Sequence, residues 1–436
     1  MNGVINIITR DAKDRQGLLV SVTGGTFERL TASARYGMEF GDDGYGALWA
    51  KFYDRDELDD DHNADPFLPD NWDSVAFGFR YDWDPPTPDR LSLQGSWHQL
   101  RAEDSFRGQS LAPPYWSIQE YDRLGTLFHL MGRYGHRFSE SSEASVQVYY
   151  DSDHNDYGNG DLMYETIDIE SQYRFALGER HDLVVGAGYR WITDEYDPND
   201  TYAITFFTPE ESIRDTPSFF AQDEIEILPD SLSLILGVKV EENDYTGWEF
   251  QPSGRLKAKP CDSHLLWGAV SRAVRIPARF EADTSGSVVV PPTLLPAPYD
   301  AAGLPLLYVI EDSEMESEDL LAYELGHRFV PNASFWLDTA LFFNEYDHLA
   351  AYEFLSGLTE ATDPDHFEYM IGTDNGKDGY SYGVECSSTW RVSDNWSLKA
   401  AYSYMDVHLD FKKAANFDFA GLTLVEGTLP RHQASL

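Results

Sequence analysis

The chain is poor in features that mark several other classes of protein. Its 436 residues include two cysteines, Cys261 and Cys386, which are too few for a disulfide framework or a cysteine metal cluster. Cys261 falls in a predicted tight turn and Cys386 in a predicted strand, so a disulfide between them is not indicated. No apolar run is long enough to form a membrane-spanning helix, because the longest uncharged stretch, residues 285–299, is interrupted by four prolines.

Basic residues are also scarce. Lys and Arg total 32 against 75 Asp and Glu, which gives a formal net charge of -43. This balance argues against nucleic acid as a partner, because phosphate binding requires a basic surface. The acidic residues concentrate in connections such as 54–73, which we expect to be a solvated loop. Divalent cations should bind there only diffusely, because no calcium-loop spacing of ligands is present, and no metal site is predicted.

The chain is rich in period-two alternation. In residues 75–83, 183–191 and 231–240, large apolar side chains alternate with small, polar or charged ones. This period predicts strands whose two faces meet different surroundings. An apolar, aromatic face opposite a polar face is the pattern of a membrane β-barrel, with the apolar face toward lipid. The aromatic content of 14% and the Tyr and Trp near predicted strand ends fit girdles at the two membrane interfaces.

We therefore predict an all-β fold, a transmembrane antiparallel β-barrel with about eighteen strands in this sequence. The expected strands are 17–26, 28–40, 44–57, 73–83, 89–102, 121–138, 142–154, 160–175, 181–196, 212–228, 231–244, 248–258, 263–274, 317–330, 333–347, 379–392, 395–408 and 427–436. Short turns alternate with connections that are mostly long, and the long ones are 58–72, 103–120, 197–211, 275–316, 348–378 and 409–426. Outer-membrane barrels have short periplasmic turns and longer extracellular loops.

A soluble β-propeller or a stack of sandwiches is the alternative fold. A propeller would repeat a motif every 40–50 residues, and no such repeat is present. The polar parity also carries many charges, which suit a wet lumen better than a dry core. We predict that five of these residues face the lumen: Arg80, Asp82, Arg190, Lys239 and Glu241.

Several local sequences resemble the TonB-dependent outer-membrane receptors. Residues 2–10, NGVINIITR, resemble the end of that family's plug domain, just before the first barrel strand. Barrel motifs follow in the family's order at 218–224, 236–241, 251–256, 267–277, 324–326 and 430–433. The resemblance implies that residues 1–16 are the C-terminal remnant of a plug domain and its linker. Residues 17–436 would then be a transmembrane β-barrel that is incomplete at its C-terminal end, with about eighteen of twenty-two strands present.

The resemblance also implies a function. Such receptors import a scarce nutrient, for example a ferric siderophore or cobalamin, across the bacterial outer membrane and are driven by the TonB complex. The implied partners are the TonB complex, through a plug and TonB box absent from this sequence, outer-membrane lipid and lipopolysaccharide, and a small nutrient ligand. The barrel would be monomeric and would need no cofactor. Because plug and strands are missing, we expect these 436 residues alone not to form a working transporter. The residue pattern by itself leaves a plug-less porin-like channel or a surface adhesin barrel open.

The sequence contains no catalytic constellation, so we do not expect an enzyme. Ligand contacts are best sought in the long loops 103–120 and 197–211. Both contain aromatic side chains, which could stack on a chelated ligand, and the first also contains an arginine, which could pair with an anion. The candidates are Arg107, Tyr115, Trp116, Tyr202, Phe206 and Phe207. Packing in a loop or in an aromatic girdle is the alternative role for all six. The connection 275–316 contains apolar runs at 288–290 and 304–310, which should either pack on neighbouring loops or close as a lid over substrate.

Overall fold

The computed structural model describes residues 9–57, 70–158, 160–198, 205–295, 302–311, 314–362, 365–418, 427 and 430–436, without the side chains of Arg107, Thr205 and Phe206. Its strands are β1 (Gly17–Thr23), β2 (Glu28–Phe40), β3 (Gly44–Arg55), β4 (Trp72–Trp83), β5 (Asp89–Gln109), β6 (Trp116–Ser139), β7 (Ser142–Asp156), β8 (Gly160–Leu177), β9 (His181–Pro198), β10 (Thr205–Phe207), β11 (Glu211–Leu228), β12 (Leu232–Asn243), β13 (Gly247–Cys261), β14 (His264–Arg275), β15 (Thr284–Val290), β16 (Leu306–Glu311), β17 (Glu318–Asn332), β18 (Phe335–Phe354), β19 (Thr359–Thr362), β20 (Asp365–Ser393), β21 (Trp396–Phe411), β22 (Asn416–Phe417) and β23 (His432–Ser435). The helices are η1 (Ala12–Arg15), α1 (Arg279–Ala282) and η2 (Pro292–Leu294).

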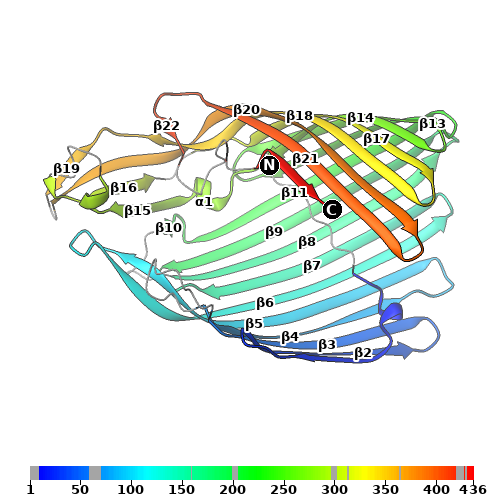
Figure 1. The fold of residues 1–436 in the computed structure, drawn as a ribbon, viewed down its shortest axis with the longest axis horizontal. Coiled ribbons are helices and arrows are strands. Elements are labelled where there is room, and N and C mark those ends of the chain that lie inside the picture. The colour runs from blue at the N-terminus through cyan, green and yellow to red at the C-terminus, as the bar shows by residue number, and fades with distance from the viewer. Residues whose placement is uncertain are drawn as a thin grey trace.

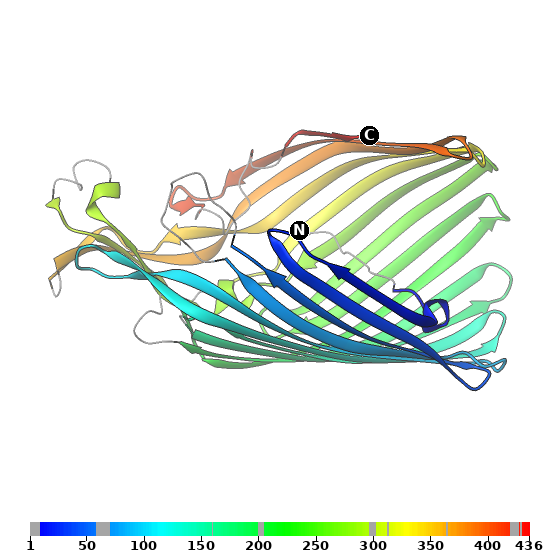
Figure 2. The same ribbon diagram turned by 60° about the horizontal axis from the view of Figure 1, so that its bottom comes forward.

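Most of the strands form one curved antiparallel sheet, which we call the wall. Each wall strand pairs with the next one, and they follow in the order β1 to β9, β11 to β14, β17, β18, β20, β21 and β23. The wall strands run obliquely between an end with tight turns and an end with long connections (Figure 1). The sheet curls round into an incomplete barrel (Figure 2), and among the described strands β1 pairs with β2 and β23 with β21. The predicted all-β barrel architecture is thus confirmed, with every expected strand present in the wall.

The alternation in sequence explains the two faces of the wall. Phe77 and Phe79 on β4 are 53% and 38% exposed on its outer face, as expected of side chains that meet lipid. Arg80, on the opposite parity, contacts the N-terminal segment that lies against the inner face. The apolar outer belt ends toward the long connections at Glu345 and Asp347 on β18, whose charges mark the edge of the hydrocarbon region. None of the helices in the described part of the chain is long and apolar enough to cross a bilayer.

Several segments predicted as loops contain strands. Residues 103–120 were expected to be a loop, but β5 and β6 continue as a paired hairpin as far as Gln109 and Trp116. Such a hairpin satisfies its own backbone groups above the membrane, where both faces meet water. The apolar and polar alternation that reveals a membrane strand is therefore lost there, and the prediction stopped too early. Cys261, placed in a turn, is the last residue of β13, and both cysteines are free.

The connections 275–316 and 348–378 together form a small outer sheet. β15 and β16 make a hairpin, β16 pairs in parallel with β20, and β10 is added on the other side of β15. Ile310, Tyr352 and Ile371 form a buried cluster, against which Val288 and Phe417 pack. The apolar runs of 275–316 therefore pack on neighbouring connections, which was one of the two expected outcomes.

Candidate functional site

Six charged side chains form a network at the end of the molecule with the long connections. We call this set the rim network: Asp194, Arg214, Arg275, Arg279, Glu281 and Glu318. Its centre is the short connection between β14 and β15, which contains α1. The two charged side chains of α1, Arg279 and Glu281, bind different parts of the wall, so this connection is fixed on two sides.

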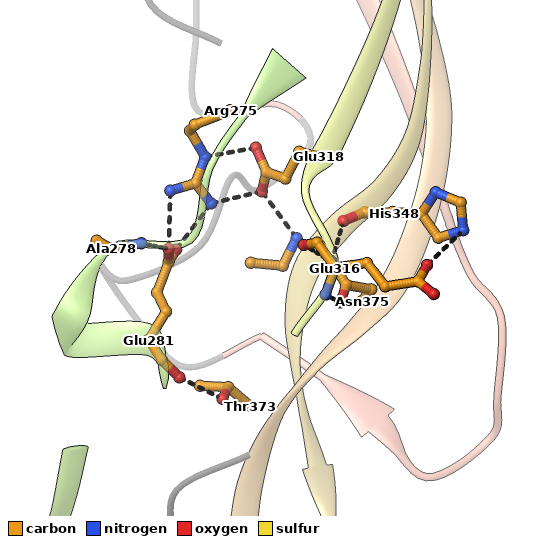
Figure 3. A network of polar contacts seen from close by, with 9 residues as sticks. Arg275, Ala278, Glu281, Glu316, Glu318, His348, Thr373 and Asn375 are labelled. Atoms are coloured by element: carbon orange, nitrogen blue, oxygen red, sulfur yellow. Dashed lines mark hydrogen bonds and ion pairs between the residues drawn. The ribbon is translucent and has the colours of Figure 1, made fainter. Parts of the chain in front are cut away.

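The first half of the network is organised by Arg275, the last residue of β14 (Figure 3). Its guanidinium donates to Glu318 at 2.6 and 2.7 Å and to Glu281 at two distances of 2.8 Å. The hydrogen bonds to Glu318 raise the pKa of Arg275 well above its ordinary value, and those to Glu281 add to the effect. Burial alone would raise the pKa of Glu318, but hydrogen bonds from Arg275 and the Ala350 N–H outweigh it and hold that pKa below its usual value. Arg275 and Glu318 are therefore both charged at neutral pH.

The second half is more deeply buried. Asp194 on β9 accepts hydrogen bonds from both Arg214 on β11 and Arg279 on α1. The side chains of Arg279 and Asp194 are 7% and 3% exposed. The Arg279 guanidinium also donates to the Glu210 carbonyl at 3.0 Å and lies 4.5 Å from the centre of the Phe207 ring. Removing one partner from such a site leaves an uncompensated buried charge, so these contacts depend on one another.

Neutral hydrogen bonds connect the same region to β20. The Thr373 hydroxyl donates to the Glu281 carbonyl at 2.6 Å. The Asn375 side chain accepts from the Glu316 N–H at 2.7 Å and donates to the carbonyls of Glu316 and His348 (Figure 3). β20 therefore holds both the segment before β17, through Asn375, and α1, through Thr373.

A cleft of about 830 Å³ opens beside the rim network. It lies between the β12–β13 turn, the end of α1 and the segment before β17, and its lining includes the acidic residues Asp244, Glu249, Asp283, Glu314, Glu316 and Asp319. Arg272 pairs with two of them, Asp319 at 2.6 Å and Glu249 at 3.5 Å. Burial, with a smaller contribution from Asp283, raises the pKa of Tyr245 at the cleft to about 12. The cleft therefore offers a surplus of negative charge, which attracts cations and repels anions.

The described residues contain no group of three or more His, Cys, Asp or Glu arranged to hold a metal ion. Five of the cleft carboxylates contact different partners: Asp283 accepts from Tyr245, Glu249 from Thr246 and Asp244 from the Asp215 N–H, while Asp319 pairs with Arg272 and Glu316 with His348.

The structure brings only part of the predicted ligand-contact set together. Phe207 packs against Arg279 and, edge to face, against Tyr196 at 5.4 Å. Phe206 lies beside it in β10, but its side chain is outside the described set, as is that of Arg107 in β5. Tyr202 lies outside the described residues altogether.

Tyr115 and Trp116 lie at the tip of the β5–β6 hairpin. Tyr115 has a positive φ of 68°, and Trp116 is 41% exposed. The register partner of Trp116 is Gln109, whose side-chain carbonyl accepts a hydrogen bond from the Val289 N–H on β15 at 2.6 Å. β15 in turn pairs with β10, so the two predicted loops meet through the outer sheet.

The five polar residues predicted for the lumen are all paired. Arg80 donates to Asp82 at 2.8 Å and also to Thr9 and Asp11 of the N-terminal segment. The Ala12 N–H donates to Asp82 at 2.7 Å. In the other two pairs, Arg190 donates to Asp168 at 2.8 Å and Lys239 to Glu241 at 2.5 Å.

The rim network was not anticipated from the sequence. Arg275 was noted only as part of a strand motif, and Glu318 and Asp194 fall near the ends of expected strands. A usable signal was present, because Arg275, Arg279 and Glu281 are charged residues that open a connection otherwise dominated by uncharged ones. Nothing in that spacing indicates Asp194, which lies 85 residues from Arg279.

Comparisons with known proteins identify the family and the fold of the chain. A family model described as "TonB dependent receptor-like, beta-barrel" matches residues 12–436. The fold is similar to the siderophore receptor PirA from Pseudomonas aeruginosa, with a TM-score of 0.63 and 12% identity over 91% of this chain and 67% of that one. It is also similar to a mutant of the ferric enterobactin receptor PfeA from Pseudomonas aeruginosa, with a TM-score of 0.67 and 13% identity over 89% of this chain and 61% of that one.

The FrpB iron transporter from Neisseria meningitidis gives a TM-score of 0.61 and 11% identity over 91% of this chain and 62% of that one. The chain thus spans about two thirds of these solved structures or less. A search of curated proteins finds no match. Identities this low support the fold alone, whereas the family model extends over nearly the whole chain. The chain therefore belongs to the TonB-dependent receptor-like β-barrel family, whose members are receptors of the bacterial outer membrane.

Proposed function

We propose that this protein takes part in TonB-dependent uptake of a scarce nutrient, such as a ferric siderophore or cobalamin. The observation that carries the proposal is the family match over residues 12–436. The named functions of PirA, PfeA and FrpB support iron complexes as the cargo class. The family match favours this function over a plug-less porin-like channel or a surface adhesin barrel.

The N-terminal segment fits the proposed organisation. Residues 9–15 lie against β2, β3 and β4, where Arg80 and Asp82 hold Asp11 and Ala12. This is the arrangement expected if residues 1–16 link a plug to the first wall strand and residues 17–436 belong to the barrel. The TonB complex would then act on this protein through the plug.

We infer that the cargo is neutral or cationic rather than strongly anionic. The basic side chains of the rim network are each paired with a carboxylate, and the neighbouring cleft has an acidic surplus. A multiply charged anion would have to displace these internal carboxylates or accept their repulsion. The aromatic side chains Tyr115 and Trp116, with Phe206 and Phe207, would supply stacking surfaces for a chelate.

Growth assays test the uptake proposal directly. A strain that lacks the gene should lose growth on one ferric siderophore or on limiting cobalamin, and the wild-type gene should restore that growth only when TonB is active. Titration of the purified protein with iron chelates of net positive, zero and negative charge would test the charge inference. TonB-independent restoration of growth would refute the uptake proposal, and tightest binding of the most anionic chelate would refute only the inference about charge.

A further inference from the structure

We propose that the lipid-facing wall carries a binding site for a single phospholipid of the periplasmic leaflet, with an acyl-chain groove over Gly268 and a headgroup contact at His264 and His327. The groove has a volume of about 360 Å³ and crosses β13, β14, β17 and β18. It is separate from the rim network, which lies at the other end of these strands.

The strand register explains why a groove exists here. One row across the outer face reads Leu256, Gly268, Leu325 and Leu341, and the next row toward the turns reads Ala258, Leu266, His327 and Thr339. The four leucines of these rows are 46 to 63% exposed and stand up from the wall. Gly268 has no side chain, and Ala258 and Thr339 are small, so the outer surface is depressed between the leucines.

The position of the groove determines its occupant. Its leucines belong to the same outward parity as the apolar belt, so whatever fills the groove lies in hydrocarbon. Bilayer acyl chains are the apolar partner available at that depth. The lining is almost entirely apolar, and its polar members, His327 and Thr339, lie in the row nearer the turns.

The histidines supply the polar end. His264 is the first residue of β14 after the tight turn, which places it at the depth of the periplasmic headgroups. The His264 and His327 rings are nearly parallel, with an interplanar angle of 6°, and His264 also stacks on Phe329 with ring centres 4.7 Å apart. Both rings are therefore held in place by neighbours on the outer face.

The hydrogen bond between the rings prepares a donor for phosphate. It joins His264 Nδ1 and His327 Nε2 at 2.9 Å. One ring must donate and the other accept, so a neutral accepting ring carries its own proton on its second nitrogen. Whichever tautomer is present, one outer N–H remains to donate to a phosphate oxygen. An uncharged glyceride headgroup offers a much weaker acceptor.

Native mass spectrometry of the full chain, purified in mild detergent, can test this site with phosphatidylglycerol and diacylglycerol as the two probes. Wild type should retain one phosphatidylglycerol and bind it about tenfold more tightly than diacylglycerol, the ratio expected for one charge-assisted hydrogen bond. Gly268→Leu fills the groove and should reduce retention of both lipids.

Gly132→Leu is the matched control. Gly132 is another outward glycine, and a Cβ built there meets a leucine Cδ atom at 3.1 Å, against 3.0 Å at Gly268. It lies on β6, far from the groove, so retention should not change. Heat-modifiable gel mobility would report folding of each variant. Equal retention by wild type and folded Gly268→Leu would overturn the groove assignment.

A double substitution tests the headgroup contact without depending on Gly268. His264→Phe with His327→Phe keeps an aromatic ring at each position and removes the nitrogen donors of both. We expect it to lose the preference for phosphatidylglycerol over diacylglycerol while still retaining an acyl chain. A wild-type protein that shows no such preference, or a double variant that keeps it, would exclude the phosphate contact.

Discussion

The wall and the rim network are stabilised by different kinds of interaction. In the wall, the same backbone pairing and outward apolar side chains recur from strand to strand, so no single residue is indispensable. In the rim network, a few buried charges from five elements depend on specific partners, and Arg275 alone satisfies two carboxylates. The wall should therefore tolerate substitutions that respect its alternation, whereas the rim should fail at single positions.

The largest effect should follow from Arg275→Met. This change removes the cation between Glu281 and Glu318 and leaves two largely buried carboxylates without their ion pair, at a local cost of about 3–5 kcal/mol. We expect the connection containing α1 to become accessible to protease while the barrel keeps its heat-modifiable mobility. Arg90→Met is the control, because the Arg90–Asp84 pair is exposed and contributes roughly 0–1 kcal/mol. Unchanged protease resistance in Arg275→Met would show that the rim does not depend on this pairing.

In the wall, a large loss of stability should require a charged side chain at a position that faces lipid. Val148 lies near the middle of β7 and is 43% exposed on the outer face, so Val148→Arg should cost about 2–4 kcal/mol. Gln147→Arg, one residue away on the opposite parity, should cost less than about 1 kcal/mol. Urea titration of the protein in liposomes would measure both values. Similar costs for the two variants would contradict the assignment of the two faces.

Acid should weaken the rim before it affects the wall. The folded pKa of Glu318 is lowered, so its contribution to stability is complete above the ordinary carboxyl pKa of about 4.3 and is lost as the pH falls toward the folded value. The pKa of Asp347 is also lowered, by hydrogen bonds with Asp378 and Lys412. Hydrogen exchange between pH 7 and about pH 3.5 should show protection declining first in α1 and in the segment before β17. If the wall lost its protection over the same pH range, the rim network would not be more sensitive to acid than the wall.

The smallest effect is expected at the N-terminal segment. Arg80→Gln removes the pairing with Asp11 but leaves the Ala12 N–H and Ser92 hydroxyl bonded to Asp82. We expect a cost of about 1 kcal/mol, seen as faster cleavage near residues 9–15 with no change in the barrel. Release of the whole segment would show that Arg80 is its principal anchor.

The sequence predicts the wall well because each wall strand displays its surroundings locally. Phe77 and Arg80 are three residues apart and already indicate that the two faces meet lipid and polar groups. The prediction failed where both faces of a strand meet water, as at the end of β5. There the strand is held by hydrogen bonds to β6, and backbone pairing of this kind requires no alternation of apolar and polar side chains.

The site was harder to predict because its partners are distant in sequence. Phe207 was proposed for stacking on a ligand, and its ring lies against Arg279, a residue that the prediction did not include. Asp194 and Glu318 each find their arginines only after several strands have paired, and long-range pairing of this kind is invisible to local pattern analysis. The predicted lumen pairs Arg80–Asp82 and Lys239–Glu241 were easier, because their members lie two residues apart on one strand.

The parallel pairing of β16 with β20 sets an order of events in biogenesis. Leu306 is paired with Phe367, and β17 and β18 lie between them in the chain. Two parallel strands must be joined by a long connection, which here includes β17 and β18. Closing that connection costs conformational entropy before any contact between β16 and β20 has formed. The outer sheet can therefore be completed only after the connections have crossed the membrane and β20 has joined the wall. A newly inserted barrel would pass through a stage in which the wall strands are paired but the outer sheet is not yet formed. Formation of the outer sheet would be the last step of its assembly.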